Sequence, residues 1–222
     1  MAIKLVIIKE NILKDNEERS KFLKAKFDIS KTLVVNLMSS PGAGKTSTIL
    51  ETLKRLGDEV KVAVIEGDIT STVDAEKMDR VGVPVIQINT GGACHLDSAM
   101  VAQAIEGFDT SPYDLIIVEN VGNLVCPAEF EVGEDLRVMI LSIPEGHDKP
   151  KKYPLMFMDT IACLLNKIDL APYTDFDIEE FRQSVVGLNP YTTIFQVSMK
   201  TGEGLEAWVN WLKKKIENKK NG

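Results

Sequence analysis

Residues 39–46, with the sequence SSPGAGKT, have the glycine spacing and the Lys-Thr pair of a phosphate-binding loop. They match the pattern G-x-x-x-x-G-K-[ST] except at the first position, which is serine. Gly42 and Gly44 let the backbone turn several N–H groups toward a phosphate chain. Lys45 is placed to reach the terminal phosphates and stabilise charge on the transferred group, and the Thr46 hydroxyl is placed to bind Mg²⁺. The nucleotide-binding residues predicted here are Ser40, Pro41, Gly42, Ala43, Gly44, Lys45, Thr46 and Ser47.

A second motif, Asn166-Lys167-Ile168-Asp169, has the form N-K-x-D and follows an apolar run. The Asp169 carboxylate can accept hydrogen bonds from N1–H and the exocyclic amine of guanine, whereas adenine leaves this charged acceptor unpaired at a high cost. Asn166 and Lys167 are expected to brace the loop. A later segment, Ser198-Met199-Lys200, resembles the S-A-K element of GTPases. Together with the phosphate loop, these motifs predict that the nucleotide is GTP.

Carboxylates at two strand ends are predicted to complete a magnesium site with Thr46. Asp68 and Glu119 each follow an apolar run, and a carboxylate beside the phosphate loop can hold Mg²⁺ directly or through water. Asp74 is the other candidate, although a carboxylate that starts a helix explains it equally well, and the choice between Asp68 and Asp74 stays open. Gly122 completes an E-x-x-G element whose N–H can meet the γ-phosphate. Because no glutamine is placed to orient the attacking water, we expect slow intrinsic hydrolysis.

Cys94, His95 and Cys126 form a candidate site for a transition metal. Their segments follow strands expected to end at the edge that carries the phosphate loop, and thiolates with an imidazole suit Zn²⁺ or Ni²⁺. Three ligands leave a tetrahedral site incomplete, so a water or the thiolates of a second subunit would complete it. Cys163, inside an apolar run, is expected in the core, and His147 is expected to be a solvated loop residue.

The chain places Cys126 only four residues after Gly122. If Gly122 moves with the γ-phosphate, Cys126 moves too, which gives a route from the nucleotide state to metal affinity. By linkage, the metal must then alter nucleotide affinity or dimerisation.

Composition limits the class of protein. The 222 residues fit one domain with a small extension, and 44% hydrophobic residues are typical of a globular chain. A formal charge of -7 argues against a nucleic-acid partner. The lack of a long apolar run and of a signal peptide, together with three cysteines, predicts a cytoplasmic protein with free thiols and no membrane contact.

The elements that must position these residues alternate between apolar runs and helical patterns from Lys31 onward. The predicted fold is α/β: a P-loop NTPase fold with a mostly parallel sheet of about seven strands and helices on both faces. Its ligand site belongs at the carboxyl ends of the strands. The expected strands are Leu33–Leu37, Val60–Glu66, Val83–Asn89, Leu115–Glu119, Leu136–Ser142, Ile161–Leu165 and Ile194–Val197, and the expected helices are Lys45–Leu56, Ser71–Val81, Leu96–Gly107, Asp177–Val186 and Leu205–Lys219.

Residues 1–30 are expected to form an N-terminal helical arm, and residues 31–222 a GTPase domain with the metal site embedded in it. The arm has helical spacing of apolar residues, interrupted by the polar stretch 14–21. Two short helices and one partly exposed helix both fit this pattern. The arm either packs on its own domain or serves as a dimer arm.

The runs TGGACHLDSAMV, IIVENVGNLVCPAEF, IPEGHDKPKKYP and LLNKIDLA together resemble the HypB family of GTPases, which assist nickel insertion into [NiFe]-hydrogenase. The resemblance covers most of the chain, from about Leu33 onward. It implies a SIMIBI-class P-loop fold, a homodimer promoted by GTP, and a metal site at the dimer interface. It further implies that Lys152 reaches the nucleotide of the partner subunit and that Leu170 is a dimer contact. A hydrogenase large-subunit precursor and other nickel-insertion accessory proteins are the implied partners.

The chain departs from this family in two respects. It has neither the cysteine-rich N-terminal motif nor the histidine-rich stretch of some members, so nickel storage at the N-terminus is not expected. His147 stands where the family more often has an acidic residue. Two alternatives stay open: a urease-accessory GTPase, whose metal motif is typically Cys-Pro-His, and a GTP-binding protein in which zinc only clamps a dimer.

Overall fold

The computed structural model describes residues 8–68, 78 and 80–222. Asp74, predicted as a magnesium ligand, lies outside these residues, and so does nearly all of the helix expected at 71–81. The phosphate loop, both nucleotide motifs and the three candidate metal ligands lie inside them.

Within these residues, seven strands form one sheet in which every pairing is parallel. β1 lies at the centre, and the strands that follow are added first on one side of it and, from β5 onward, on the other. Such a switch point leaves a crevice outside the carboxyl ends of the strands, where α/β proteins bind ligands. The order across the sheet is β3 (Val85–Asn89), β2 (Val62–Asp68), β4 (Leu115–Glu119), β1 (Leu33–Ser39), β5 (Leu136–Ser142), β6 (Ala162–Asn166) and β7 (Thr193–Gln196).

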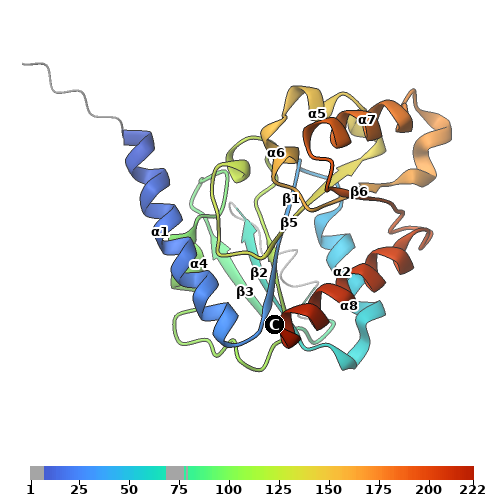
Figure 1. The fold of residues 1–222 in the computed structure, drawn as a ribbon. Coiled ribbons are helices and arrows are strands. Elements are labelled where there is room, and N and C mark those ends of the chain that lie inside the picture. Colours follow the sequence, from blue (N-terminus) through green and yellow to red (C-terminus); the bar gives the residue numbers. More distant parts are fainter. Residues whose placement is uncertain (1–7, 69–77, 79) are drawn as a thin grey trace, which may run out of the picture.

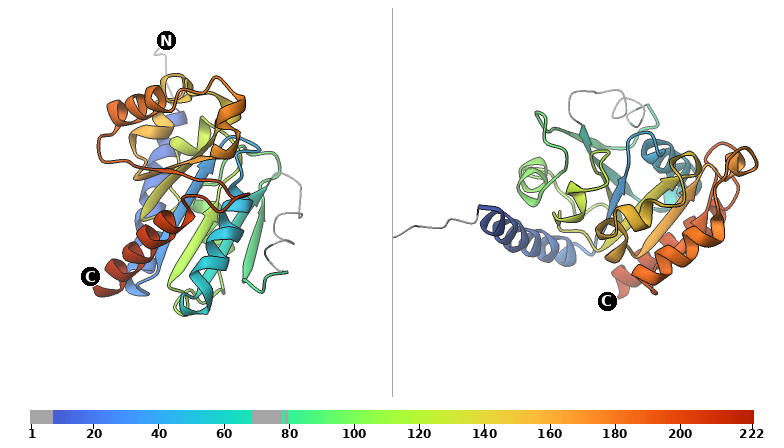
Figure 2. Two further views of the ribbon diagram at one scale, coloured as in Figure 1. Left: turned by 90° about the vertical axis from the view of Figure 1, so that its right-hand side faces the viewer. Right: turned by 90° about the horizontal axis from the view of Figure 1, so that it is seen from above.

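Helices cover both faces of this sheet, which confirms the predicted fold (Figures 1 and 2). The α-helices described are α1 (Ile8–Ile29), α2 (Lys45–Leu56), α4 (Ser98–Ala104), α5 (Lys149–Lys152), α6 (Leu155–Met158), α7 (Ile178–Leu188) and α8 (Leu205–Asn221). Short 3-10 helices are η1 (Gly57–Glu59), η2 (Cys126–Ala128), η3 (Ile143–Glu145) and η4 (Ile168–Tyr173). Within the described part of the chain, we find no helix with the length and apolar composition that crossing a membrane requires.

Two differences from the expected helices have local causes. α4 begins later than predicted because the Asp97 side chain accepts a hydrogen bond of 2.8 Å from Met100 N, which caps the helix at that point. α5 and α6 were not predicted. Each is a single turn with a proline at its start, Pro150 or Pro154, and is too short to produce a periodic pattern.

The core follows the alternation of side chains along each strand. In β1, Leu33, Val35 and Leu37 pack with α2 and α8, whereas Val34 packs on the other face with α1 and α4. Helices α6 and α7 pack over β5 and β6 on that second face. The phosphate loop leads from β1 into α2, the helix that covers the first of these two faces.

α1 is one helix of 22 residues that packs on its own domain. Among residues 11–29 of this helix, Asn16, Ser20, Leu23 and Phe27 are buried, and their spacing of four, three and four is that of one helix face. α1 lies beside α4 (Figure 1). The polar stretch read as a break therefore lies inside the helix, with two buried polar side chains continuing the inward face.

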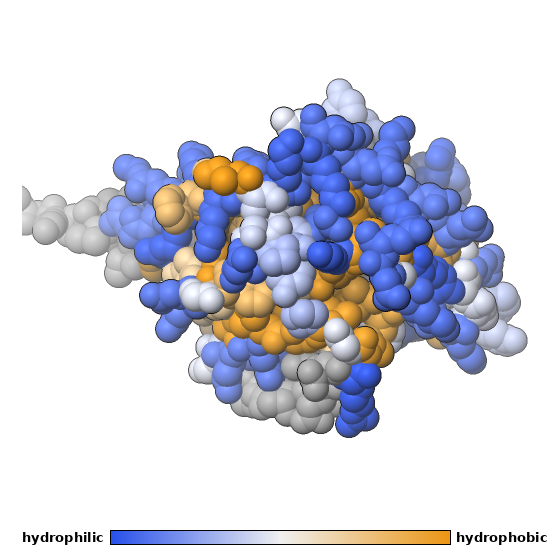
Figure 3. Space-filling view, turned by 90° about the horizontal axis from the view of Figure 1, so that it is seen from below, coloured by the Kyte–Doolittle hydropathy of each residue, from blue (hydrophilic) through white to orange (hydrophobic). Residues whose placement is uncertain are grey.

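The edge of the sheet at the amino ends of the strands has a different surface. Hydrophobic residues gather in the middle of this side of the molecule, with hydrophilic residues around them (Figure 3). A groove of about 690 Å³ at that edge is lined by aliphatic and charged side chains, and Leu53, Val60, Val62 and Val83 are among the aliphatic ones. The side chains with chemistry instead gather at the carboxyl edge.

Candidate nucleotide and metal sites

The phosphate loop joins the central strand β1 to the start of α2. Gly42 and Gly44 both have positive φ, 76° and 104°, which residues with a Cβ rarely adopt. α2 begins at Lys45, directly after Gly44. The N–H groups of its first turn have no partner within the helix, so this end of α2 favours an anion.

Ser39, the departure from the loop pattern, is fully buried at the end of β1. Its hydroxyl donates to the Ser40 carbonyl at 2.7 Å and accepts from Lys45 Nζ at 3.2 Å. The neighbouring Ser40 hydroxyl donates to the Glu145 carboxylate. The serine thus fits the turn and holds the lysine at the loop. Glu145 of η3, which the sequence motifs did not predict, therefore contacts the phosphate loop through Ser40.

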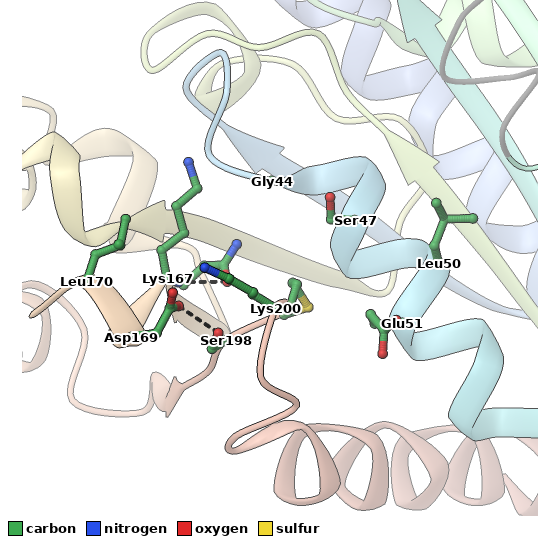
Figure 4. Close-up of a pocket in the computed structure, with 11 residues that line it drawn as sticks. Gly44, Ser47, Leu50, Glu51, Lys167, Asp169, Leu170, Ser198 and Lys200 are labelled. Carbon is green, nitrogen blue, oxygen red and sulfur yellow. Dashed lines mark hydrogen bonds between the residues drawn. The ribbon is translucent and has the colours of Figure 1, made fainter.

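The base motif and the phosphate loop line one cavity of about 510 Å³ (Figure 4). Asn166 Nδ2 donates to the Ala43 carbonyl at 2.9 Å, and Lys167 Nζ donates to the Gly42 carbonyl at 2.8 Å. A Cβ on Gly44 would lie 2.6 Å from Asn166 Nδ2, so the two motifs touch. The cavity is lined by Gly44, Ser47, Leu50, Glu51, Asn166, Lys167, Asp169, Leu170, Ser198, Met199 and Lys200.

Asp169 is held in place by the second predicted base-binding segment. The Ser198 hydroxyl donates to Asp169 Oδ1 at 2.6 Å, and Ser198 is itself fully buried. This bond turns one oxygen of Asp169 toward β7 and leaves the carboxylate at the cavity wall (Figure 4). A carboxylate fixed in this way offers acceptors to a base with two adjacent N–H donors, which is guanine.

The predicted magnesium residues meet at the end of β4. Thr46 Oγ1 donates to Glu119 Oε1 at 2.8 Å, and Glu119 is 4% exposed. Gly122 lies against the phosphate loop, since a Cβ on it would be 3.0 Å from Pro41 Cα. A hydroxyl and a carboxylate are donors that suit Mg²⁺, so the residues present fit this ion. Glu66 of β2 is also buried, and it is the register partner of Glu119 of β4. The sequence motifs did not predict it as a site residue.

Asp68 ends β2, two residues beyond Glu66 and therefore on the same face of the sheet. It is half-buried, and its carbonyl accepts a hydrogen bond of 3.0 Å from Thr90 N. Its assignment to magnesium stays a prediction.

The three candidate metal ligands lie together, from two segments separated by 30 residues of sequence. Cys94 Sγ is 2.8 Å from Cys126 Sγ and 3.8 Å from His95 Nδ1, and the three ligand atoms all lie within 4.8 Å of one another. The three residues are half-buried, and both cysteines are free thiols. The His95 ring stacks on Phe130 with ring centroids 3.9 Å apart. Two sulfurs and an imidazole nitrogen suit Ni²⁺ or Zn²⁺.

Burial lowers the pKa of His95, which favours the neutral imidazole that binds metal. The hydrogen bond with Cys94, followed by burial, raises the pKa of Cys126. Asn123 accepts from Cys126 N at 3.3 Å through Oδ1 and donates to Cys126 Sγ at 3.7 Å through Nδ2. A cation that displaces the thiol protons therefore meets ligands already in place.

A buried asparagine connects this cluster to the magnesium end of the nucleotide site. Asn120 follows Glu119 and is fully buried. Its Oδ1 accepts from Leu96 N at 3.0 Å, and its Nδ2 donates to Asn36 Oδ1 at 3.1 Å. Because Leu96 directly follows His95, one side chain joins the end of β4 to the segment that carries the metal ligands.

The remaining predicted residues lie apart from these clusters. Cys163 is fully buried in β6, as predicted, and burial raises its pKa. Lys152 is on the exposed side of α5, where Nζ lies 2.5 Å from Asp148 Oδ2. His147 differs from the expected solvated residue: it is half-buried, Nδ1 accepts from Asp177 N at 3.2 Å, and Nε2 lies 3.5 Å from Glu180 Oε2. It therefore holds the start of α7.

Comparison with known proteins assigns the family. Residues 33–196 match the family described as CobW/HypB/UreG, nucleotide-binding domain. The chain is 44% identical over 209 residues to hydrogenase maturation factor HypB of Escherichia coli strain K12, which covers 94% of this chain and 72% of that protein. The chain belongs to the HypB family. The recognition from the sequence motifs is thus confirmed.

Two further HypB comparisons extend over almost the whole chain. The hydrogenase/urease maturation factor HypB of Helicobacter pylori strain 26695 is 39% identical over 223 residues, covering 98% of this chain and 91% of that protein. The crystal structure of HypB from Helicobacter pylori in complex with nickel superposes with a TM-score of 0.87 and 36% identity, covering 92% of this chain and 96% of that one. This HypB chain therefore shares both sequence and fold with a nickel-bound relative.

Proposed function

We propose that this protein is a GTP-hydrolysing metallochaperone that binds nickel or zinc and assists nickel delivery during [NiFe]-hydrogenase maturation. The observation that carries the proposal is the cluster of Cys94, His95 and Cys126 at the sheet edge that also carries the phosphate loop. The family membership and the nickel complex of a HypB relative support it.

The proposed nucleotide chemistry uses groups already in place. Lys45 and the loop N–H groups stabilise the charge that develops on the transferred phosphoryl group, and Asp169 selects guanine. Thr46 and Glu119, with Asp68 or Asp74, would hold Mg²⁺, which when bound neutralises charge on the β- and γ-phosphates. The expected products are GDP and phosphate, formed at a slow intrinsic rate.

The proposed coupling runs along the chain from Gly122 to Cys126. Gly122 lies against Pro41 of the phosphate loop, so a γ-phosphate bound there changes the position of the segment that leads to Cys126. GTP binding orders this segment and promotes a homodimer. Hydrolysis relaxes it and releases nickel to the next protein, a hydrogenase large-subunit precursor or another accessory protein.

The dimer is proposed to place Lys152 and Leu170 at the subunit interface. Lys152 is exposed on α5, and its Nζ pairs with Asp148, so this ammonium group can leave Asp148 and bind a phosphate of the nucleotide on the partner subunit. Leu170 lies on the wall of the base cavity. A second subunit facing this edge also supplies ligands to complete the three-ligand metal site.

The decisive experiment measures nickel affinity with GDP and with a non-hydrolysable GTP analogue bound, together with nickel transfer to an acceptor chelator. We expect nickel to bind more tightly with the GTP analogue than with GDP, and nickel transfer to the chelator to be faster when GTP is hydrolysed. Equal affinities in both states, with metal retained whatever the nucleotide, would instead identify a structural zinc clamp.

Two cysteine variants control this measurement. Cys126→Ala is expected to lower nickel affinity by at least about a hundredfold, more than the loss of an outer hydrogen bond causes. GTP affinity measured without nickel should be unchanged. Cys163→Ala removes a buried thiol outside the cluster and is expected to retain nickel binding. Equal nickel binding by the wild type and Cys126→Ala would contradict the proposed site.

A further inference from the structure

Asn16 is a buried polar residue in the N-terminal helix, outside every motif of the nucleotide site. It is 6% exposed and lies on the inward face of α1, one turn before Ser20. A buried amide requires hydrogen-bond partners for both its oxygen and its nitrogen, because an unsatisfied polar group in the interior is costly. The hydrogen-bond partners of Asn16 therefore show which segments of the chain this part of α1 contacts.

Asn16 makes three hydrogen bonds to two other segments of the chain, through its side-chain oxygen, its side-chain nitrogen and its backbone carbonyl. Asn16 Oδ1 accepts from Ser98 N at 2.8 Å, and the Asn16 carbonyl accepts from Ser98 Oγ at 2.9 Å. Asn16 Nδ2 donates to the Glu131 carbonyl at 3.0 Å. One residue of α1 thus ties the start of α4 to the loop that follows η2.

These two segments are the ones that carry the metal ligands. Ser98 lies three residues after His95, and Glu131 lies five residues after Cys126. Glu131 also follows Phe130, the ring on which His95 stacks. Fixing Ser98 and Glu131 relative to each other fixes the two rings of this stack.

We propose that Asn16 is a positioning residue of the metal site, which makes α1 part of that site. It holds Phe130 against His95 and sets the separation of the segments that bear Cys94 and Cys126. The inference rests on the proposed function for its metal readout. Its structural readout, the stacking of His95 on Phe130, applies to the metal-free protein as well.

Ser20 provides a matched control on the same helix face. It is 4% exposed, and its hydroxyl accepts from Gly133 N at 3.2 Å, so it also ties α1 to the second segment. It has no contact with Ser98 among the bonds described, and so it does not bridge the two segments. Ser20→Ala therefore reproduces the loss of one buried hydrogen bond without the loss of the bridge.

The test compares Asn16→Ala, Asn16→Asp and Ser20→Ala in the full chain. Asn16→Ala is expected to lower nickel affinity about tenfold or more, as the loss of groups that orient metal ligands does. Asn16→Asp keeps the acceptor for Ser98 N but loses the donor to Glu131, so an intermediate loss is expected. Ser20→Ala should stay within about twofold of the wild type. Affinity for a GTP analogue, measured without nickel, should be unchanged in all three variants.

The metal-free readout is the NMR signal of the His95 ring protons, which the Phe130 ring shields in the wild type. Asn16→Ala should move these signals toward unshielded values, and Ser20→Ala should not. Equal nickel affinities and equal ring shifts for Asn16→Ala and Ser20→Ala would overturn the proposal. If the wild type bound no nickel, the proposed function would fail, and the ring shifts alone would decide the role of Asn16. Should Asn16→Ala not fold, the intermediate loss expected for Asn16→Asp is compared with Ser20→Ala, and equal nickel affinities and ring shifts in these two variants would overturn the proposal.

Discussion

The nucleotide site and the metal site share one edge of the sheet but are constructed differently. The nucleotide site consists of two continuous motifs that touch directly, through Asn166 to Ala43 and Lys167 to Gly42. The metal site consists of three side chains whose segments are held by residues outside it, Asn120 and Asn16. The first site is therefore determined mainly by local sequence, and the second by tertiary contacts.

The largest expected effect tests how far one residue of a motif determines the nucleotide site. Asp169→Asn keeps one oxygen acceptor but replaces the other with an amide N–H, so one hydrogen bond to a charged group is lost and a guanine N–H is left facing another donor. At about 1.5–3 kcal/mol for the lost bond and about 1–3 kcal/mol for the unpaired donor, the change lowers GTP affinity about a hundredfold or more. The new amide can donate to the C2 oxygen of xanthine, so affinity for a xanthosine nucleotide should rise. Titration with both nucleotides measures this exchange.

Nickel affinity of nucleotide-free Asp169→Asn should match the wild type. A parallel fall in nickel affinity would contradict the separation of the two sites.

An intermediate effect is expected where the two sites meet. Asn120→Ala leaves Leu96 N without its acceptor and Asn36 without its donor, both in the core. The free energy of unfolding should fall by about 1–3 kcal/mol. Because Asn120 joins the end of β4 to the His95 segment, the difference in nickel affinity between the GDP and GTP-analogue states should also shrink.

Asn89→Ala is the control for this variant. Asn89 lies exposed at the same edge, where, among the residues that the structure describes, its side chain accepts only from Gly91 N, at 2.9 Å. It should change neither stability nor coupling. If Asn120→Ala lost stability but kept the full nucleotide dependence of nickel binding, coupling would run along the Gly122–Cys126 segment alone.

The smallest effect concerns the far end of α1, where Asp28 pairs with Lys219 of α8. That hydrogen bond is the main cause of the lowered pKa of Asp28 in the folded protein. The pair therefore stabilises the fold at pH values above the unfolded pKa of Asp28, and this contribution is lost as pH falls through the folded pKa. Since the Asp28 side chain is 50% exposed, Asp28→Asn should cost about 0.5 kcal/mol or less at neutral pH.

Denaturant titrations of the wild type and Asp28→Asn at neutral and acidic pH measure this difference, which should vanish in acid. Neither nickel affinity nor GTP affinity should change in Asp28→Asn, whereas nickel affinity is expected to fall in the Asn16 variants on the same helix. A loss of nickel affinity in Asp28→Asn would indicate that the whole of α1, and not one bridging residue, positions the metal ligands.

The sequence predicted the parts of the site that lie in short motifs. The loop around Gly44 and the Asn166–Asp169 motif required only a strand on one side and a helix or turn on the other. Because buried parallel strands appear in the sequence as apolar runs, the residues that follow those runs could be assigned to the carboxyl edge of the sheet. This assignment predicted that Cys94 and Cys126 lie at the same edge, where the structure places them close together. Glu66 was not predicted, because its proximity to Glu119 depends on the register of β2 with β4.

The N-terminal helix shows why the rest was not predicted from sequence. Residues 14–21 contain Asn16 and Ser20 among charged side chains, and apolar periodicity is interrupted there. The inward face of α1 continues through them because each finds a hydrogen-bond partner on another segment, Ser98, Glu131 or Gly133. A polar residue buried by such contacts gives no signal in a hydrophobic pattern.

The sequence by itself determined the fold class, the phosphate loop, the guanine motif and the identity of the candidate metal ligands. The phosphate loop and the guanine motif follow from residue types at fixed spacing, and the fold class follows from the alternation of apolar runs and helical patterns. The metal ligands were predicted from the expected order of the strands together with the resemblance to the HypB family. Only the tertiary structure decided that Asn16 and Asn120 hold the segments around Cys94, His95 and Cys126. Those hydrogen bonds join residues 24 to 115 positions apart, a range over which sequence spacing carries no information about distance in space.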